Sequence, residues 1–223
     1  MPGKERMKRR QPTSETLAGA STEDIKKDFS NEQLAGIGAV AMAWNEVEYL
    51  LDIMLYSALA LPSAHWLDVV TRINGIEGKL EILRQFIARN RRIAADAAAV
   101  MKQSMDDAGL YKTFRDAVVH ARVFNAPAGI GQRIERQAKI SQVILTREAL
   151  DGFYDRLVLL RREFQGILAV FDILRAFRVT RSSPALIDPR TTQSLPTAQA
   201  WMVQVQAHQS QRLFLPPLPK FPD

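Results

Sequence analysis

Apolar residues recur at spacings of three and four along most of this chain, which is the pattern of amphipathic helices. The longest run lies between residues 150 and 174 and predicts a bundle helix or a coiled-coil seam, capped by Thr146. A second long helix is predicted from its cap Ser30 to about Leu61, because Pro62 then ends it. One side of this helix repeats every seven residues, at Ile37, Val40, Trp44, Val47, Leu51, Met54 and Ala58.

The same N-terminal helix has a second apolar strip on another side. This strip consists of Met42, Tyr49, Ile53 and Tyr56. A helix with two apolar sides needs cover on both, so we expect a central position in the bundle or a contact with a second subunit. Charged residues in its middle, Glu46, Glu48 and Asp52 among them, argue against a membrane span.

Two shorter segments continue the helical pattern. A turn and short helix are predicted within 63–74, and an amphipathic helix is predicted from Ile76 to Ala88. Arg89, Arg91 and Arg92 follow the second of these helices. We interpret these arginines as a solvated helix end whose charge complements the helix dipole.

The stretch 110–124, which reads LYKTFRDAVVHARVF, extends an alanine-rich helical segment that begins at Ala94. Its apolar positions predict a stripe that faces the core, formed by Leu110, Phe114, Ala117, Ala121 and Phe124. At about 100° per residue, a second face points outward. We expect this outer face to carry Arg115, Asp116, Val119 and His120.

The helical pattern stops after Phe124. A loop at 125–131 is followed by two short runs, 133–136 and 142–145, which predict the strands of a hairpin. The sequence therefore predicts an all-α bundle of four to five helices with a short β-hairpin as an insertion.

Composition divides the chain into three regions. Residues 1–30 are predicted to be a disordered basic arm, 31–180 the helical domain, and 181–223 a proline-rich, largely irregular tail. Each region carries a net charge of only +2, so the overall +6 does not come from one strongly basic segment. Tight nonspecific DNA binding is therefore not indicated.

The chain has no cysteine, which excludes disulfides, thiol catalysis and cysteine metal sites. Its three histidines are scattered, so useful zinc-ligand spacing is missing. We therefore expect no metal and no cofactor.

Arg115, Asp116 and His120 are the candidate catalytic residues. Asp116 and His120 are one helical turn apart, and a carboxylate in that position can orient an imidazole and raise its basicity. Arg115 supplies a permanent cation whose forked donors suit a phosphate group. The alternative is an ordinary exposed helix pair worth a few tenths of a kcal/mol. Substrate binding is expected of the basic side chains near the end of this helix, Arg122, Arg133, Arg136 and Lys139.

The order of helices, together with the R-x4-6-H motif from Arg115 to His120, resembles the HEPN superfamily over residues 31–177. Asp116, directly after the arginine, and Trp44 with Glu46 and Glu48 are also similar to members of that family. The resemblance implies metal-independent RNA cleavage in a cleft between two subunits of a homodimer. His120 would transfer protons, Arg115 would stabilise phosphoryl charge and Asp116 would orient His120.

The resemblance leaves a second interpretation open, because many members of the family are non-catalytic dimerisation or binding modules. RNA is the candidate substrate, and an antitoxin or another protein is a candidate partner. Toxin–antitoxin, antiviral and RNA-processing roles all fit the resemblance. The expected location is the cytoplasm, with no membrane partner.

Overall fold

The computed structural model describes residues 29–60, 66–73, 75–119, 123–124, 130–134, 140–182 and 199–201. These residues form an all-α bundle, as the sequence predicts. Its helices are α2 (Asn31–Leu59), α3 (Trp66–Arg72), α4 (Gly75–Arg89), α5 (Ala95–Val119) and α6 (Arg147–Ser182), and residues 199–201 add one helical turn. A small sheet contains β1 (Val123–Phe124), β2 (Ile130–Ile134) and β3 (Ile140–Ile144).

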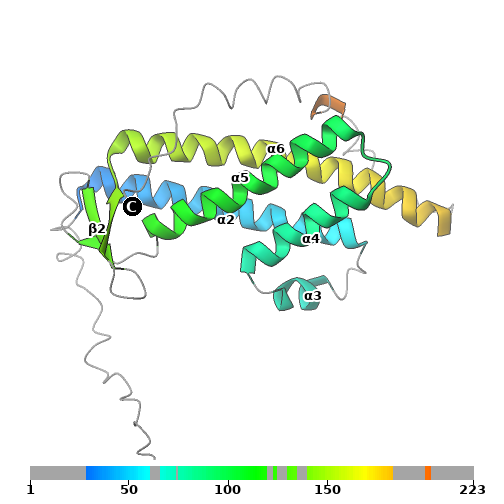
Figure 1. The fold of residues 1–223 in the computed structure, drawn as a ribbon, viewed down its shortest axis with the longest axis horizontal. Coiled ribbons are helices and arrows are strands. Elements are labelled where there is room, and N and C mark those ends of the chain that lie inside the picture. Colours follow the sequence, from blue (N-terminus) through cyan, green and yellow to red (C-terminus); the bar gives the residue numbers. More distant parts are fainter. Residues whose placement is uncertain are drawn as a thin grey trace, which may run out of the picture.

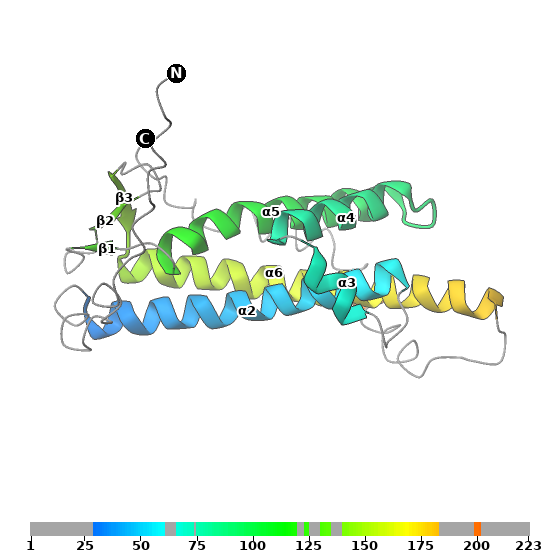
Figure 2. The same ribbon diagram turned by 90° about the horizontal axis from the view of Figure 1, so that it is seen from below.

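The bundle has two layers. α2 and α6 lie side by side and run in the same direction, while α4 and α5 form a helical hairpin that covers them (Figures 1 and 2). α5 runs opposite to α2 and α6, so its C-terminal end lies beside the small sheet (Figure 1). The turn between α4 and α5 therefore lies toward the opposite end of the bundle.

Both long helices begin at the capping residues that the sequence predicts. The Ser30 side chain accepts a hydrogen bond from the Gln33 backbone N–H, and the Gln33 side chain accepts one from the Ser30 N–H. This reciprocal capping box fixes the start of α2. At the start of α6, the Thr146 hydroxyl accepts a hydrogen bond from the Ala149 N–H.

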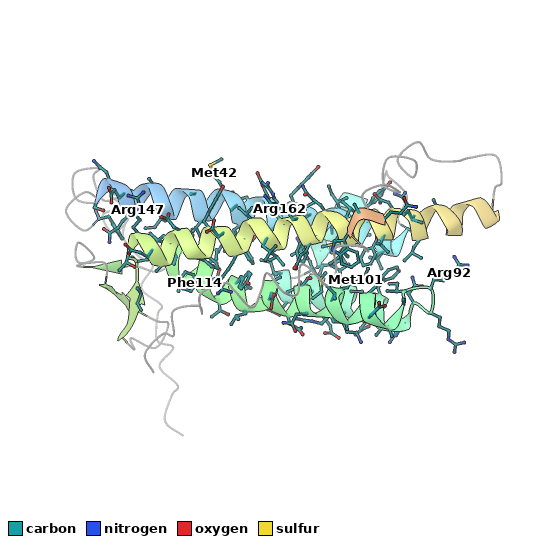
Figure 3. The ribbon with its side chains drawn as sticks, turned by 90° about the horizontal axis from the view of Figure 1, so that it is seen from above. Met42, Arg92, Met101, Phe114, Arg147 and Arg162 are labelled. Carbon is teal, nitrogen blue, oxygen red and sulfur yellow. The ribbon has the colours of Figure 1, made fainter. Side chains whose placement is uncertain are left out.

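The predicted heptad positions of the two long helices are confirmed as core. In α6 every one is buried: Leu150, Phe153, Leu157, Leu160, Phe164, Ile167, Phe171 and Leu174. In α2 the buried ones are Val40, Trp44, Val47, Leu51, Met54 and Ala58, and Ile37 packs against them. The second strip of α2 behaves differently, since Met42 and Tyr49 are 72% and 62% exposed and Met42 points away from the bundle (Figure 3).

The predicted stripe on α5 was partly wrong. Leu110 is 58% exposed, whereas Tyr111 and Val118 are buried beside Phe114. Two adjacent apolar residues differ by about 100° around a helix, and the core contacts Tyr111, which packs edge-on against Phe153. The helix ends at Val119, so Ala121 lies outside the described residues and Phe124 belongs to β1.

The hairpin lies between α5 and α6 as predicted, but its strand boundaries and strand number differ. β2 and β3 pair antiparallel with Ile130 opposite Ile144 and Ile134 opposite Ile140, and β1 adds a third strand at the edge of β2. The strand bounds follow from the paired backbone positions of this ladder rather than from the residue types of the two runs. This register starts β2 at Ile130 rather than at Arg133.

The predicted arm and tail lie mostly outside the described residues. α6 continues slightly beyond residue 180, to Ser182. Trp201, in the helical turn, is only 3% exposed and packs on α6 at Gly166. A Cβ atom at position 166 would lie 2.1 Å from Trp201 Cδ1, so this close approach requires a glycine.

Candidate functional site

The site forms where the last turns of α5 cross α2. Trp44 and Glu48 are one turn apart on α2, and the Trp44 Nε1–H donates a hydrogen bond to Glu48 Oε1. Lys112 and Asp116 are likewise one turn apart on α5, and Arg115 precedes Asp116. The i, i+4 spacing puts each pair on one helix face, and packing brings the two faces together.

Arg115 joins the two helices through its guanidinium group. Its Nη1 lies 2.8 Å from Asp116 Oδ1, and its Nη2 lies 3.2 Å from Glu48 Oε1. The guanidinium carbon is 5.7 Å from the centroid of the Trp44 ring, within the range of a cation–π contact. The Arg115 side chain is only 16% exposed. Arg115 is therefore oriented by two carboxylates and an aromatic ring rather than extended into solvent.

Asp116 is held by two cations. Its Oδ1 accepts from Arg115, and its Oδ2 lies 2.8 Å from Lys112 Nζ. Partial burial raises the pKa of Asp116, but hydrogen bonds from and charges on Lys112 and Arg115 outweigh this effect, so the pKa lies below its ordinary value. Asp116 is therefore a carboxylate at neutral pH.

The cluster formed by Trp44, Glu48, Lys112, Arg115 and Asp116 is electrically balanced, because it contains two cations and two carboxylates. An anion that binds Arg115 must therefore displace Glu48 or Asp116 from the guanidinium. Otherwise it must bind to a guanidinium that Glu48 and Asp116 already contact. Such an exchange is possible at the solvent-accessible edge, since the Glu48 and Asp116 side chains are 34% and 28% exposed.

The other predicted site residues cannot be placed in this cluster. His120, Arg122, Arg136 and Lys139 lie outside the described residues, and Arg133 is placed only as a backbone position in β2. β2 lies at the same end of the bundle as the C-terminal end of α5 (Figure 1). The orientation of His120 by Asp116 and the grouping of the basic residues stay predictions.

Three features of the observed cluster differ from the sequence interpretation. Val119 was expected to face outward, but it is partly buried and packs against the core. Lys112 was missed as a partner of Asp116, although its i, i+4 spacing is the same as that of His120. Trp44, Glu46 and Glu48 were named only as part of the resemblance to the HEPN superfamily. The contact between Glu48 and Arg115 was not predicted, because it depends on how α2 and α5 pack.

Within the described residues, no group of three or more histidine, aspartate or glutamate side chains has a geometry that could hold a metal ion. None of the helices in that part of the chain is both long and apolar enough to cross a membrane. The chain matches no protein-family model, and no curated protein or solved structure matches it.

Proposed function

We propose that this protein is a homodimeric, metal-independent endoribonuclease of the HEPN type, with Arg115 and His120 as catalytic residues. The observation that supports this most directly is the fixed position of Arg115 in the last turns of α5, five residues before His120. A preorganised guanidinium is suited to stabilise charge that develops on a phosphoryl group.

In this proposal His120 takes a proton from the ribose 2′-hydroxyl or gives one to the leaving 5′-oxygen. Arg115 contacts the phosphoryl oxygens as negative charge grows on them. Because Glu48 and Asp116 neutralise Arg115 in the free protein, substrate phosphate competes with these carboxylates for the guanidinium. A second copy of α5 across a two-fold axis supplies a second arginine and histidine to the same cleft.

A non-catalytic dimeric interaction module of the same fold is the second candidate. It is favoured by the pairing of both terminal nitrogens of Arg115 with carboxylates, which is typical of a structural ion-pair network. Met42 and Tyr49 on the outer side of α2 provide apolar surface for a second subunit, in either candidate. An antitoxin or another regulatory protein is a further partner that we propose for the dimer.

The test of the proposed activity is cleavage of labelled single-stranded RNA by the full-length protein, with and without EDTA. The proposed chemistry uses only protein side chains, so cleavage is expected to persist in EDTA and to leave a 2′,3′-cyclic phosphate. His120→Ala is expected to lower the rate by about 10²–10⁴-fold. Arg115→Ala is expected to lower it similarly, and Asp116→Ala by less.

Arg147→Ala is a matched control, because Arg147 also lies near two carboxylates, Glu32 at 3.8 Å and Asp151 at 3.4 Å. Its side chain is 67% exposed and belongs to α6, so this variant is expected to cleave RNA normally. Equal cleavage by wild type and His120→Ala would reject the proposed mechanism. A dimer by light scattering that cleaves no RNA would support the interaction module, and a monomer would contradict both candidates.

A further inference from the structure

A groove of about 490 Å³ lies at the end of the bundle where α4 turns into α5. Leu59 from the end of α2 contributes to its apolar lining together with Ile82 and Phe86 from α4. The Phe86 ring is fixed by an edge contact with Phe171 of α6, with 4.9 Å between the ring centroids. Arg89, Arg91 and Arg92 lie along the same groove.

The turn that follows Arg89 and carries Arg91 and Arg92 is held by its own hydrogen bonds. The Ile93 N–H donates to the Asn90 carbonyl oxygen at 3.1 Å, and the Arg92 N–H donates to Asn90 Oδ1 at 3.2 Å. Ile93 also packs against the core. The backbone at Arg91 and Arg92 is therefore fixed relative to the apolar wall, and Figure 3 places Arg92 at this end of the bundle.

The three arginines differ from four other arginines of the bundle in their charge environment. Arg84, Arg115, Arg147 and Arg161 each form an ion pair with a carboxylate. Arg89, Arg91 and Arg92 are exposed and form no ion pair within the described part of the chain. The described lining of the groove contains no carboxylate. Within the described residues, three positive charges thus lie beside an apolar wall whose lining includes no carboxylate.

We propose that this groove binds a small amphipathic anion, a molecule with an aliphatic or aromatic body and a phosphate, sulfonate or carboxylate group at one end. The body packs on Leu59, Ile82 and Phe86, and the anionic group contacts the arginines of the turn. The volume lies within the range of small-molecule sites. The favourable interaction of the arginines with the dipole of α4 explains why positive charge lies at this helix end. It does not explain why an open apolar wall lies beside that charge.

This site is independent of the proposed ribonuclease function. Arg115 lies about 20 residues along α5 from the turn, which corresponds to about 30 Å at the rise of an α-helix. Substitutions at one site therefore have no shared side-chain contact with the other. Loss of RNA cleavage would say nothing about the groove, and loss of anion binding would say nothing about cleavage.

The experiment measures binding of anilinonaphthalene sulfonate to the full-length protein by fluorescence, followed by displacement with dodecyl phosphate, dodecanoate and butyl phosphate. Saturable displacement by dodecyl phosphate is expected, with butyl phosphate much weaker. Displacement by dodecanoate as well as dodecyl phosphate would indicate a general anionic head group, and displacement by dodecyl phosphate alone would restrict the ligand to phosphates.

Two variants test separately how the arginine charges and the apolar wall contribute to binding, and a third variant is the control. The double variant Arg91→Gln, Arg92→Gln is expected to weaken dodecyl phosphate binding at least about ten-fold. Leu59→Gln is expected to weaken dodecyl phosphate more than butyl phosphate, and circular dichroism checks its fold. Arg162→Gln removes an exposed arginine of α6 away from the groove and is expected to bind normally (Figure 3).

Absence of saturable displacement by either dodecyl compound would overturn the proposal. An equal loss in Arg162→Gln and the double variant would also overturn it, because nonspecific charge attraction would then explain the binding. If a single-stranded RNA oligonucleotide displaces the fluorescent probe more strongly than dodecyl phosphate does, the proposal is overturned and the ligand is a nucleic acid. If the protein binds vesicles of anionic lipid and free dodecyl phosphate does not displace the probe, the proposal is overturned and the groove binds a membrane surface.

Discussion

Arg115 and three arginines near the turn between α4 and α5, namely Arg89 at the end of α4 and Arg91 and Arg92 in the turn, illustrate two ways in which the same residue type is placed in one bundle. Arg115 is largely buried, contacts Glu48 and Asp116, and lies beside an aromatic ring. The arginines of the turn are exposed and lie beside a groove without a carboxylate among its described residues. The comparison shows that basic residues of one type differ in the partners with which an incoming anion would have to compete.

The two regions also differ in what an anion must overcome to bind. At Arg115 an incoming phosphate competes with two carboxylates that the fold already supplies. At the turn, the competitors are water and counter-ions, which exposed charges exchange readily. We therefore expect Arg115 to contribute mainly to stability and to transition-state binding, and the turn arginines mainly to ground-state binding.

The largest expected effect comes from removing the guanidinium of Arg115, and the same substitution at Arg91 is the comparison. Arg115→Ala is expected to lower the free energy of unfolding by about 2 kcal/mol, since Glu48 and Asp116 then share only the charge of Lys112. Arg91→Ala is expected to change it by no more than about 0.5 kcal/mol, as for most surface substitutions. Urea denaturation followed by circular dichroism measures the free energy of unfolding of both variants. Equal losses of this free energy would contradict the distinction between the two arginine environments.

A second test uses the acid titration of Asp116. Folding lowers the pKa of this carboxyl, so its ionised form contributes stability that is fully present above the unfolded pKa of about 3.9. The contribution is lost as the pH falls from there through the lower folded pKa. Asp116→Asn is therefore expected to cost about 1 kcal/mol at pH 7, and the cost should shrink below about pH 4. A cost that does not depend on pH would contradict this charge assignment.

The smallest expected effect concerns Lys112, whose side chain is 31% exposed. Lys112→Met removes one i, i+4 ion pair on α5 and is expected to cost about 0.3–0.5 kcal/mol. Raising the salt concentration should reduce this cost more than that of Arg115→Ala, because exposed pairs are screened more strongly. Thermal unfolding at low and high salt measures both. A larger loss of stability for Lys112→Met than for Arg115→Ala would contradict the expectation that Arg115 contributes more to stability than Lys112.

The long helices could be predicted because their heptad patterns are unambiguous over many turns. Ser30 and Thr146 cap α2 and α6 as predicted. The stripe on α5 could not be placed reliably, because Leu110 and Tyr111 are adjacent and both apolar. Only the position of Phe153 on α6 shows which of them belongs to the core.

The candidate site was less predictable than the fold. Asp116 has Lys112 four residues before it and His120 four residues after it, and spacing alone cannot decide which of them it contacts. The structure provides the contact with Lys112. The pairing of Glu48 with Arg115 joins residues far apart in the sequence and depends on the crossing of α2 and α5. The groove beside the arginines of the turn is likewise a consequence of packing.

The close contact between Gly166 and Trp201 has a consequence for sequence variation. A side chain at position 166 would occupy the space of the indole, so the two positions cannot enlarge independently. In related sequences, a larger residue at 166 should therefore accompany a smaller one at 201. The same coupling should appear between the single substitutions Gly166→Ala and Trp201→Ala, whose costs should not add. The segment around Trp201 would then evolve together with α6 rather than as a separate tail.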